Sequence, residues 1–139
     1  MTKSICLVSC VSKKRPQASP AKDLYISALF KKSRVWAEDH SDRWFILSAK
    51  YGLTDPEKVI EPYEQTLNRM SAFSRREWSS KIGESLRQVL QPGDTVIFLA
   101  GMKYRDNLES VLRQHGVQVR VPMEGMRIGE QLSWLSGSL

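Results

Sequence analysis

The sequence has few of the residues that build cross-links or metal sites. Its 139 residues include two cysteines and two histidines. If residues 4–10 are extended as a strand, Cys6 and Cys10 lie too far apart to bond to each other. His40 and His115 stand alone, so no group of cysteines and histidines has the spacing of a zinc site. We therefore expect neither a disulfide nor a structural metal.

Long apolar runs are also absent. No run approaches the length of a membrane span, and no signal peptide is recognised. We therefore expect no membrane association, and the low cysteine content favours a reducing cytoplasm. The length suits one domain over 1–139. A hydrophobic content of 41% with 26% charged residues is typical of a globular protein.

Acidic residues are scarce near the amino terminus. Residues 1–35 contain eight lysines and arginines but a single acid, Asp23, and the whole chain has a net charge of +6. A polyanion such as DNA would meet this end of the protein first. A solvated basic surface explains the charge equally well, so the charge alone identifies no partner. The sequence indicates no obligate protein partner.

Four short apolar runs are typical of β-strands: 5–9, 44–48, 95–100 and 117–121. The first and third runs are the most continuously apolar, so we expect them at the centre of a sheet, covered on both faces. A helical pattern follows each run. This alternation predicts a single three-layer α/β domain with a mainly parallel four-stranded sheet and helices on both faces.

Cap and turn residues place the expected helices. Ser19–Pro20 predicts the start of the first helix, and a capping box at Ser74 predicts the start of the second. A third helix is expected around 108–112, closed by Gly116, and a short last helix over 128–135.

Parallel α/β sheets bind their ligands at the carboxyl ends of the strands. The segments that follow the four expected strands each carry a cation, and two contain a Lys-Tyr pair. This chemistry suits an anionic ligand with an aromatic head, such as a nucleotide, although ordinary surface turns have a similar composition. The residues expected to contact DNA here are Lys13, Arg15, Lys50, Lys103, Tyr104, Arg105 and Arg127.

The long segment 50–72 is expected to fold over this site as an active-site loop. Long loops in compact domains usually carry function, and the aromatic and aliphatic residues of this one argue against disorder. Asp55 and Glu61 lie beside prolines and are the candidate catalytic carboxylates, because an enclosed carboxylate can activate water or stabilise a cation. Asp55 could equally open an Asp-Pro turn.

A second set of side chains is expected to contact the base of such a ligand. Tyr51, Tyr63 and Tyr104 could stack on it, although a lone tyrosine such as Tyr63 is more often a core residue. Glu124 and Gln131 could read its polar edge, or serve ordinary roles near a helix start. The expected base-binding residues are Cys10, Ser12, Tyr51, Tyr63, Glu124 and Gln131.

Several stretches resemble DUF6884, a bacterial family of domains of unknown function, over nearly the whole chain. They lie at 8–14, 21–27, 44–56, 61–63, 99–101 and 122–129. More distantly, Tyr51-Gly-Leu53 and Pro62-Tyr63 are similar to pieces of the YaaA family of DNA-binding stress proteins. Cys10 with Lys14 resembles a Cys-x-x-x-Lys motif of archaeosine-forming enzymes. Both of these resemblances imply nucleobases in nucleic acid, and the broader neighbourhood of base-exchanging transglycosylase relatives and phage-defence glycosylases implies chemistry at an N-glycosidic bond.

The leading hypothesis is a DNA glycosylase that hydrolyses the N-glycosidic bond of a flipped, modified nucleobase, in phage defence or repair. Asp55, Glu61 and Lys14 are its candidate catalytic residues, and such an enzyme needs no metal or nucleotide cofactor. Two alternatives stay open: a DNA-binding module without catalysis, and a hydrolase or transferase of free nucleosides or nucleotides. The basic amino-terminal residues favour DNA over free nucleosides, and the carboxylates of the long loop favour catalysis over simple binding.

Overall fold

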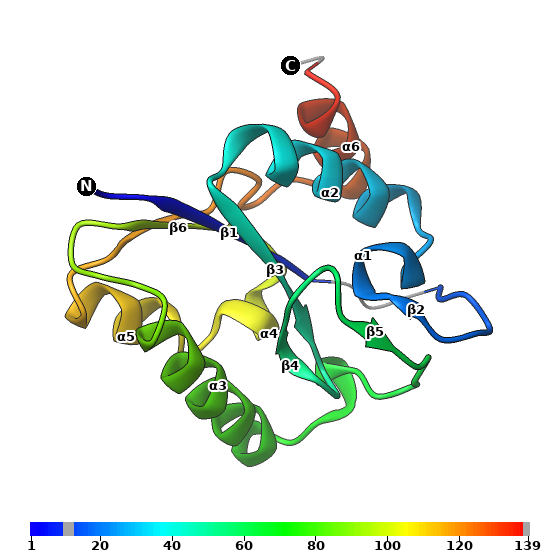
Figure 1. Ribbon diagram of the computed structural model, residues 1–139, viewed down its shortest axis with the longest axis horizontal. Helices are drawn as coiled ribbons and strands as arrows, with labels where there is room; N and C mark the ends of the chain where they lie inside the picture. Colours follow the sequence, from blue (N-terminus) through cyan, green and yellow to red (C-terminus); the bar gives the residue numbers. More distant parts are fainter. Residues whose placement is uncertain (10–12, 138–139) are drawn as a thin grey trace.

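The computed structural model describes residues 1–9 and 13–137. Its centre is a five-stranded sheet of order β4-β3-β1-β6-β7 (Figure 1). The parallel pairs are β1 with β3, β1 with β6, and β6 with β7, whereas β4 runs antiparallel to β3. The bounds of these strands are Ser4–Ser9 (β1), Arg43–Ser48 (β3), Gly52–Thr54 (β4), Thr95–Leu99 (β6) and Gln118–Arg120 (β7).

The burial of the strands follows their composition. Ile5, Cys6, Leu7 and Val8 of β1 are fully buried, as an apolar strand flanked by strands on both sides and covered on both faces must be. β6 is also an internal strand, and the more polar β7 forms an edge. The expected mainly parallel sheet, with β1 at its centre, is therefore confirmed.

The expected count of four strands is wrong, because a fifth strand follows β3 directly. Gly52 adopts a positive φ of 74°, which suits glycine, and the chain turns back there into the short β4. A separate two-stranded sheet pairs β2 (Ser19–Pro20) with β5 (Val59–Ile60) in antiparallel fashion. No apolar run of strand length marks β2, β4 or β5 in the sequence.

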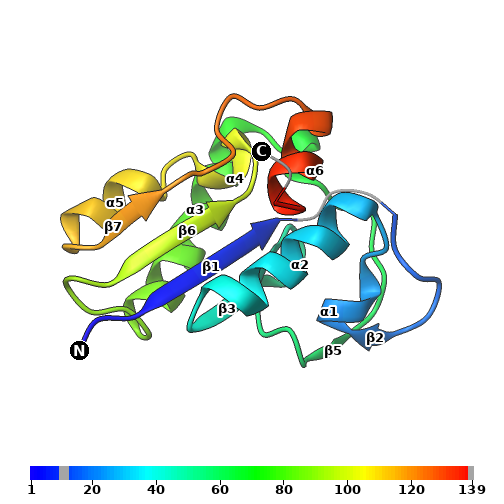
Figure 2. The ribbon, with the colours of Figure 1, turned by 90° about the horizontal axis from the view of Figure 1, so that it is seen from above.

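Helices cover both faces of the sheet. Figure 1 shows α2 and α6 on one side and α3 and α5 on the other. Viewed from above, α4 and α6 both lie near the carboxyl ends of β1 and β6 (Figure 2). The helices are α1 (Ala21–Leu24), α2 (Ala28–His40), α3 (Ala72–Arg87), α4 (Met102–Arg105), α5 (Glu109–Gln114) and α6 (Ile128–Leu135), with a 3-10 turn η1 (Leu67–Arg69).

Two helix starts differ from the prediction. Ser19–Pro20 forms β2 and leads directly into α1, with Pro20 at its N-cap position, but α1 has a single turn and ends at Leu24. The long helix α2 begins separately at Ala28, where the Ser27 hydroxyl accepts a hydrogen bond from the Phe30 N–H (3.2 Å). The next long helix begins one turn before the expected Ser74, because Ser71 supplies the N-cap. Serine occurs at each alternative start, so packing against the sheet decides which serine caps.

None of the helices within residues 1–9 and 13–137 combines the length and the apolar composition needed to cross a membrane.

Candidate functional site

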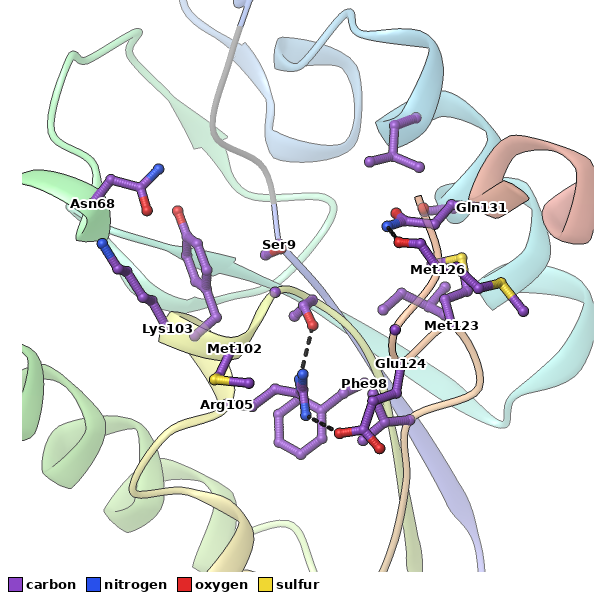
Figure 3. A pocket seen from close by; sticks show the side chains of 18 residues that line it. Ser9, Asn68, Phe98, Met102, Lys103, Arg105, Met123, Glu124, Met126 and Gln131 are labelled. Carbon is purple, nitrogen blue, oxygen red and sulfur yellow. Dashed lines mark hydrogen bonds and ion pairs between the residues drawn. The ribbon is translucent and has the colours of Figure 1, made fainter. Parts of the chain in front are cut away.

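A cavity of about 480 Å³ lies where the parallel strands end. Ser9 closes β1 at its floor, α4 follows β6 on one side, and the segment 121–126 follows β7. Leu29 and Ser33 of α2 complete the wall together with Gln131 of α6, and Gln131 is labelled in Figure 3. The cavity therefore lies at the carboxyl edge of the sheet, where the topology predicts a ligand site.

The lining of this cavity is largely apolar and rich in sulfur. Met102, Met123 and Met126, three of the five methionines in the chain, line it together with Phe98. Methionine is flexible and polarizable and makes favourable contacts with aromatic rings. Such a lining suits a flat aromatic ligand.

Arg105 lies at this cavity but is not a phosphate contact. The residue is only 5% exposed, and its Nε donates to the Ala100 carbonyl at 3.0 Å. Its Nη1 lies 3.1 Å from a carboxylate oxygen of Glu109 and 3.1 Å from one of Glu124. The expectation that Arg105 holds DNA phosphates is therefore wrong: a buried guanidinium needs carboxylate partners, and it already has them. Arg105 instead fixes Glu124, whose carboxylate lines the cavity (Figure 3).

Three more of the predicted residues reach the same cavity. Gln131 donates from Nε2 to the Met126 carbonyl at 2.9 Å, which orients its amide. Lys103 is exposed at the rim. Tyr104 is buried, with its ring edge-on to Trp78 at a centroid distance of 5.7 Å. Sequence reasoning thus places Lys103, Tyr104, Arg105, Glu124 and Gln131 at one site, although it misjudges the partner of Arg105.

A second hollow, of about 660 Å³, is strongly basic. We call it the basic groove; it is lined by Lys13, Lys14, Arg15, Pro16, Pro62, Tyr63, Glu64, Thr66 and Arg69. The turn η1 separates it from the cavity, because Asn68 lines the cavity while Thr66 and Arg69 line the groove. The two hollows are therefore neighbours that share one turn of backbone as a wall.

Lys14 and Tyr63 meet at the wall of the basic groove. The Lys14 Nζ lies 4.5 Å from the ring centroid of Tyr63 and 5.8 Å from that of Tyr25. The two tyrosine hydroxyls are 2.6 Å apart, and Ser48 Oγ donates to the Tyr63 hydroxyl at 2.8 Å. Tyr63 is thus buried and hydrogen-bonded, as a core residue would be, and also presents part of its surface to the groove.

Asp55 lies away from the cavity. The antiparallel β4 carries the chain back toward the start of β3, where an Asp55 carboxylate oxygen lies 3.8 Å from an Arg43 nitrogen. Half of the side chain is exposed, and Oδ1 accepts a hydrogen bond from the Glu57 N–H at 2.9 Å. The expectation that Asp55 is enclosed is therefore wrong. Its geometry is that of the alternative, a residue that opens an Asp-Pro turn.

The remaining predicted residues of the long loop also stay outside the cavity. Glu61 is exposed, and its carbonyl accepts from the Tyr51 hydroxyl at 3.3 Å. Lys50 and Tyr51 line a different hollow, of about 430 Å³, against α3. Arg127 is exposed at the N-cap of α6. Cys10 and Ser12 lie outside the described residues.

Sequence reasoning missed two contributors to these hollows. Arg69 belongs to no motif, and it joins Lys13 and Lys14 through tertiary packing alone. The cavity methionines could have been predicted from the sequence, since all three fall in the segments that follow β6 and β7. Among the residues that the structure describes, no cluster of three or more His, Cys, Asp or Glu side chains could hold a metal ion.

The comparisons with known proteins agree with the resemblance in the sequence. No solved structure matches the chain. "Uncharacterized protein YfjM" of Bacillus subtilis (strain 168) is 29% identical over 126 residues, which cover 81% of this chain and 79% of that protein. The family model described as "Family of unknown function (DUF6884)" matches residues 5–137. Because that match spans nearly the whole chain, the protein belongs to the DUF6884 family.

Proposed function

We propose that the protein binds DNA and hydrolyses the N-glycosidic bond of a flipped, modified nucleobase. The observation that carries the proposal is the pairing of two hollows of opposite character. A methionine-lined cavity that holds a carboxylate and an amide adjoins a basic groove across the single turn η1. An enzyme that draws one base out of DNA needs such a pair, one hollow for the base and one for the backbone.

The cavity has the size and lining that a nucleobase needs. Its volume of about 480 Å³ falls among small-molecule pockets, which commonly range from roughly 300 to 1,000 Å³. The three methionines offer contacts to the ring faces, and Gln131 offers a hydrogen bond to the ring edge. Apolar side chains interrupted by placed polar groups, here Asn68, Lys103, Glu124 and Gln131, are typical of sites that orient one ligand.

The basic groove suits a phosphate backbone. Four cations line it, Lys13, Lys14, Arg15 and Arg69, against one carboxylate, that of Glu64. Lysine and arginine that neutralise phosphates supply most of the sequence-independent affinity for DNA. The groove therefore supports binding of a strand whose base enters the neighbouring cavity.

Glu124 is the best-placed catalytic carboxylate. It lines the cavity, and Arg105 Nη1 holds its Oε2 at 3.1 Å. Within the described residues Oε1 accepts no hydrogen bond, so this oxygen can orient a water or face the positive charge that develops on the sugar as the base leaves. We therefore propose Glu124 in place of Asp55 and Glu61, with Lys14 of the groove at the phosphates.

A DNA-binding module without catalysis is the second candidate. The observation that favours it is the 63% exposure of the Glu124 side chain. A carboxylate in open contact with water is a weaker catalyst than an enclosed one. In a binding module, Arg105 and Glu124 would shape the cavity and nothing more.

Base release separates the two candidates. The protein is incubated with genomic DNA from hosts and phages that carry modified bases, and released bases are detected by mass spectrometry. We expect release by the natural protein and a loss of about a hundredfold or more in Glu124→Gln, which keeps the shape and removes the charge.

Asp55→Asn is the matched control, because it also removes one negative charge but lies outside the cavity. We expect this variant to release bases at the natural rate. Tight DNA binding without any released base would support the binding module, and absence of DNA binding would overturn both candidates.

A further inference from the structure

We propose that Gln131 is a specificity-determining residue that selects nucleobases carrying an exocyclic amino group over isosteric bases with a carbonyl at that position. This inference rests on the proposed function, since it assigns the base for which the cavity is built. The inference depends on one hydrogen bond within the protein. This bond fixes the orientation of the Gln131 amide toward a ligand in the cavity.

The Gln131 amide is oriented by its neighbour. Its Nε2 donates to the Met126 main-chain carbonyl at 2.9 Å. An amide group has a donor end and an acceptor end, whereas a carbonyl can only accept. The opposite orientation would set two oxygens against each other, so the nitrogen stays at Met126. The hydrogen bond therefore fixes the position of the acceptor Oε1, while the second Nε2 hydrogen stays on the nitrogen beside Met126.

This oxygen is an acceptor on the wall of the cavity. Figure 3 shows the amide reaching from the α6 side toward the side on which Ser9 lies. No donor among the described residues reaches Oε1. Gln131 is partly buried, and its neighbours Met123 and Met126 offer no competing donor from their side chains. A bound base must therefore supply the hydrogen bond, or the acceptor stays unpaired.

An exocyclic amino group satisfies a fixed acceptor, and a carbonyl repels it. Cytosine and uracil differ in this way at one exocyclic group, as do adenine and hypoxanthine, and in uracil and hypoxanthine the adjacent ring nitrogen changes from an acceptor to an N–H donor. The cavity is also lined by the Asn68 amide, the Glu124 carboxylate and the hydroxyls of Ser9 and Ser33. A hydroxyl can rotate to donate or accept, so it does not discriminate between the members of each pair. Glu124 can also only accept, but the proposed function assigns its exposed carboxylate to the sugar, so Gln131 is the fixed acceptor assigned to the base.

Binding to defined strands tests the inference. The probes are short fluorescent single-stranded DNAs with one test base, flanked by spacer nucleotides without bases, so that one base alone can enter the cavity. The test bases are cytosine against uracil and adenine against hypoxanthine. We expect the natural protein to bind the amino member of each pair about tenfold or more tightly in fluorescence anisotropy.

Two methionine variants complete the test. Gln131→Met keeps the length of the side chain and removes the acceptor, and we expect it to bring each affinity ratio close to one by weakening binding of the amino base. Gln114→Met makes the same substitution at an exposed position of α5 and should leave each ratio unchanged. Thermal unfolding of both variants verifies that they are folded.

The outcomes separate this inference from the proposed function. Equal binding of both members of a pair by the natural protein, or a preference that persists in Gln131→Met, overturns the role of Gln131 even if bases are released from DNA. A preference that Gln131→Met abolishes supports the role of Gln131 even if no base is released, and in that case hydrolysis alone is refuted. If no test base adds affinity over the spacers, the nucleobase cavity and the role of Gln131 fall together.

Discussion

Replacing Arg69 by glutamine tests whether the basic groove contacts the DNA backbone. Arg69 is the informative position because it lies more than fifty residues from Lys13 in sequence and reaches the same groove through the fold. The exchange removes one positive charge and keeps a polar side chain of similar shape. If the amino-terminal basic residues bound DNA on their own, replacing Arg69 would leave the affinity unchanged. If the folded basic groove binds DNA, the replacement weakens binding.

The expected magnitude follows from counterion release. Each phosphate neutralised on duplex DNA adds about 0.9 to the slope of log affinity against log salt. Four cations line the groove. If each neutralises one phosphate, the natural slope is about −3.6, and Arg69→Gln brings it to about −2.7. Lys13→Gln should produce a change of the same size, and the double variant should lose about twice as much.

Fluorescence anisotropy over a salt series measures these slopes directly. Lys31→Gln is the matched control, because Lys31 is exposed on α2 and does not line the groove. Its slope should equal that of the natural protein. The groove would be refuted as the binding surface if Arg69→Gln kept the salt slope of the natural protein while Lys13→Gln had a shallower one. The contact with DNA would then be confined to the amino-terminal segment.

Two further predictions concern stability. Asp94 is buried and accepts hydrogen bonds from the Lys3 ammonium, the Lys3 N–H and the Gln91 N–H, and these bonds lower the pKa of its carboxyl to about 2 from an ordinary 3.8. The stabilisation is present above pH 4 and lost as the pH falls toward 2, so Asp94→Asn should lower the free energy of unfolding by about 1 to 2 kcal/mol at pH 7, and urea titrations should show this difference shrinking near pH 2. Tyr63→Phe removes the hydroxyl that joins Tyr25 and Ser48, and should cost about 1 to 3 kcal/mol in the same assay while DNA affinity stays within about twofold, because the ring under Lys14 remains. An unchanged unfolding free energy in either variant would refute the proposed importance of its hydrogen bonds.

The parts of the fold that the sequence predicts are those with a long repeated pattern. Continuous apolar runs mark β1 and β6, and helical spacing marks α3 and α6, so the mainly parallel sheet and the edge that carries the cavity follow from the sequence. The strand β4 has three residues and no period to detect. Missing β4 has a large consequence, because its antiparallel direction takes Asp55 away from the cavity.

The sequence also does not show which charged side chains pair with each other in the fold. Arg105 reads as a phosphate contact because it follows a strand beside Lys103 and Tyr104. In the fold it is buried between Glu109 and Glu124. Nothing in the spacing of these residues indicates that α4, α5 and the segment after β7 converge on one guanidinium. Lys13 and Lys14, in contrast, line an open groove.

The segment 50–72 forms a fixed wall of the site, in contrast to a lid that would open and close. Its β5 pairs with β2, the Ala21 N–H donates to the Lys58 carbonyl at 2.7 Å, and the Lys22 N–H donates to the Pro56 carbonyl at 2.9 Å. Tyr63 ties the same segment to Ser48 at the end of β3. Opening it would break main-chain pairing and a buried hydroxyl network together, which is costly in a protein interior. A ligand therefore meets a cavity and a groove that are already formed, and the free energy of binding is not spent on ordering this loop.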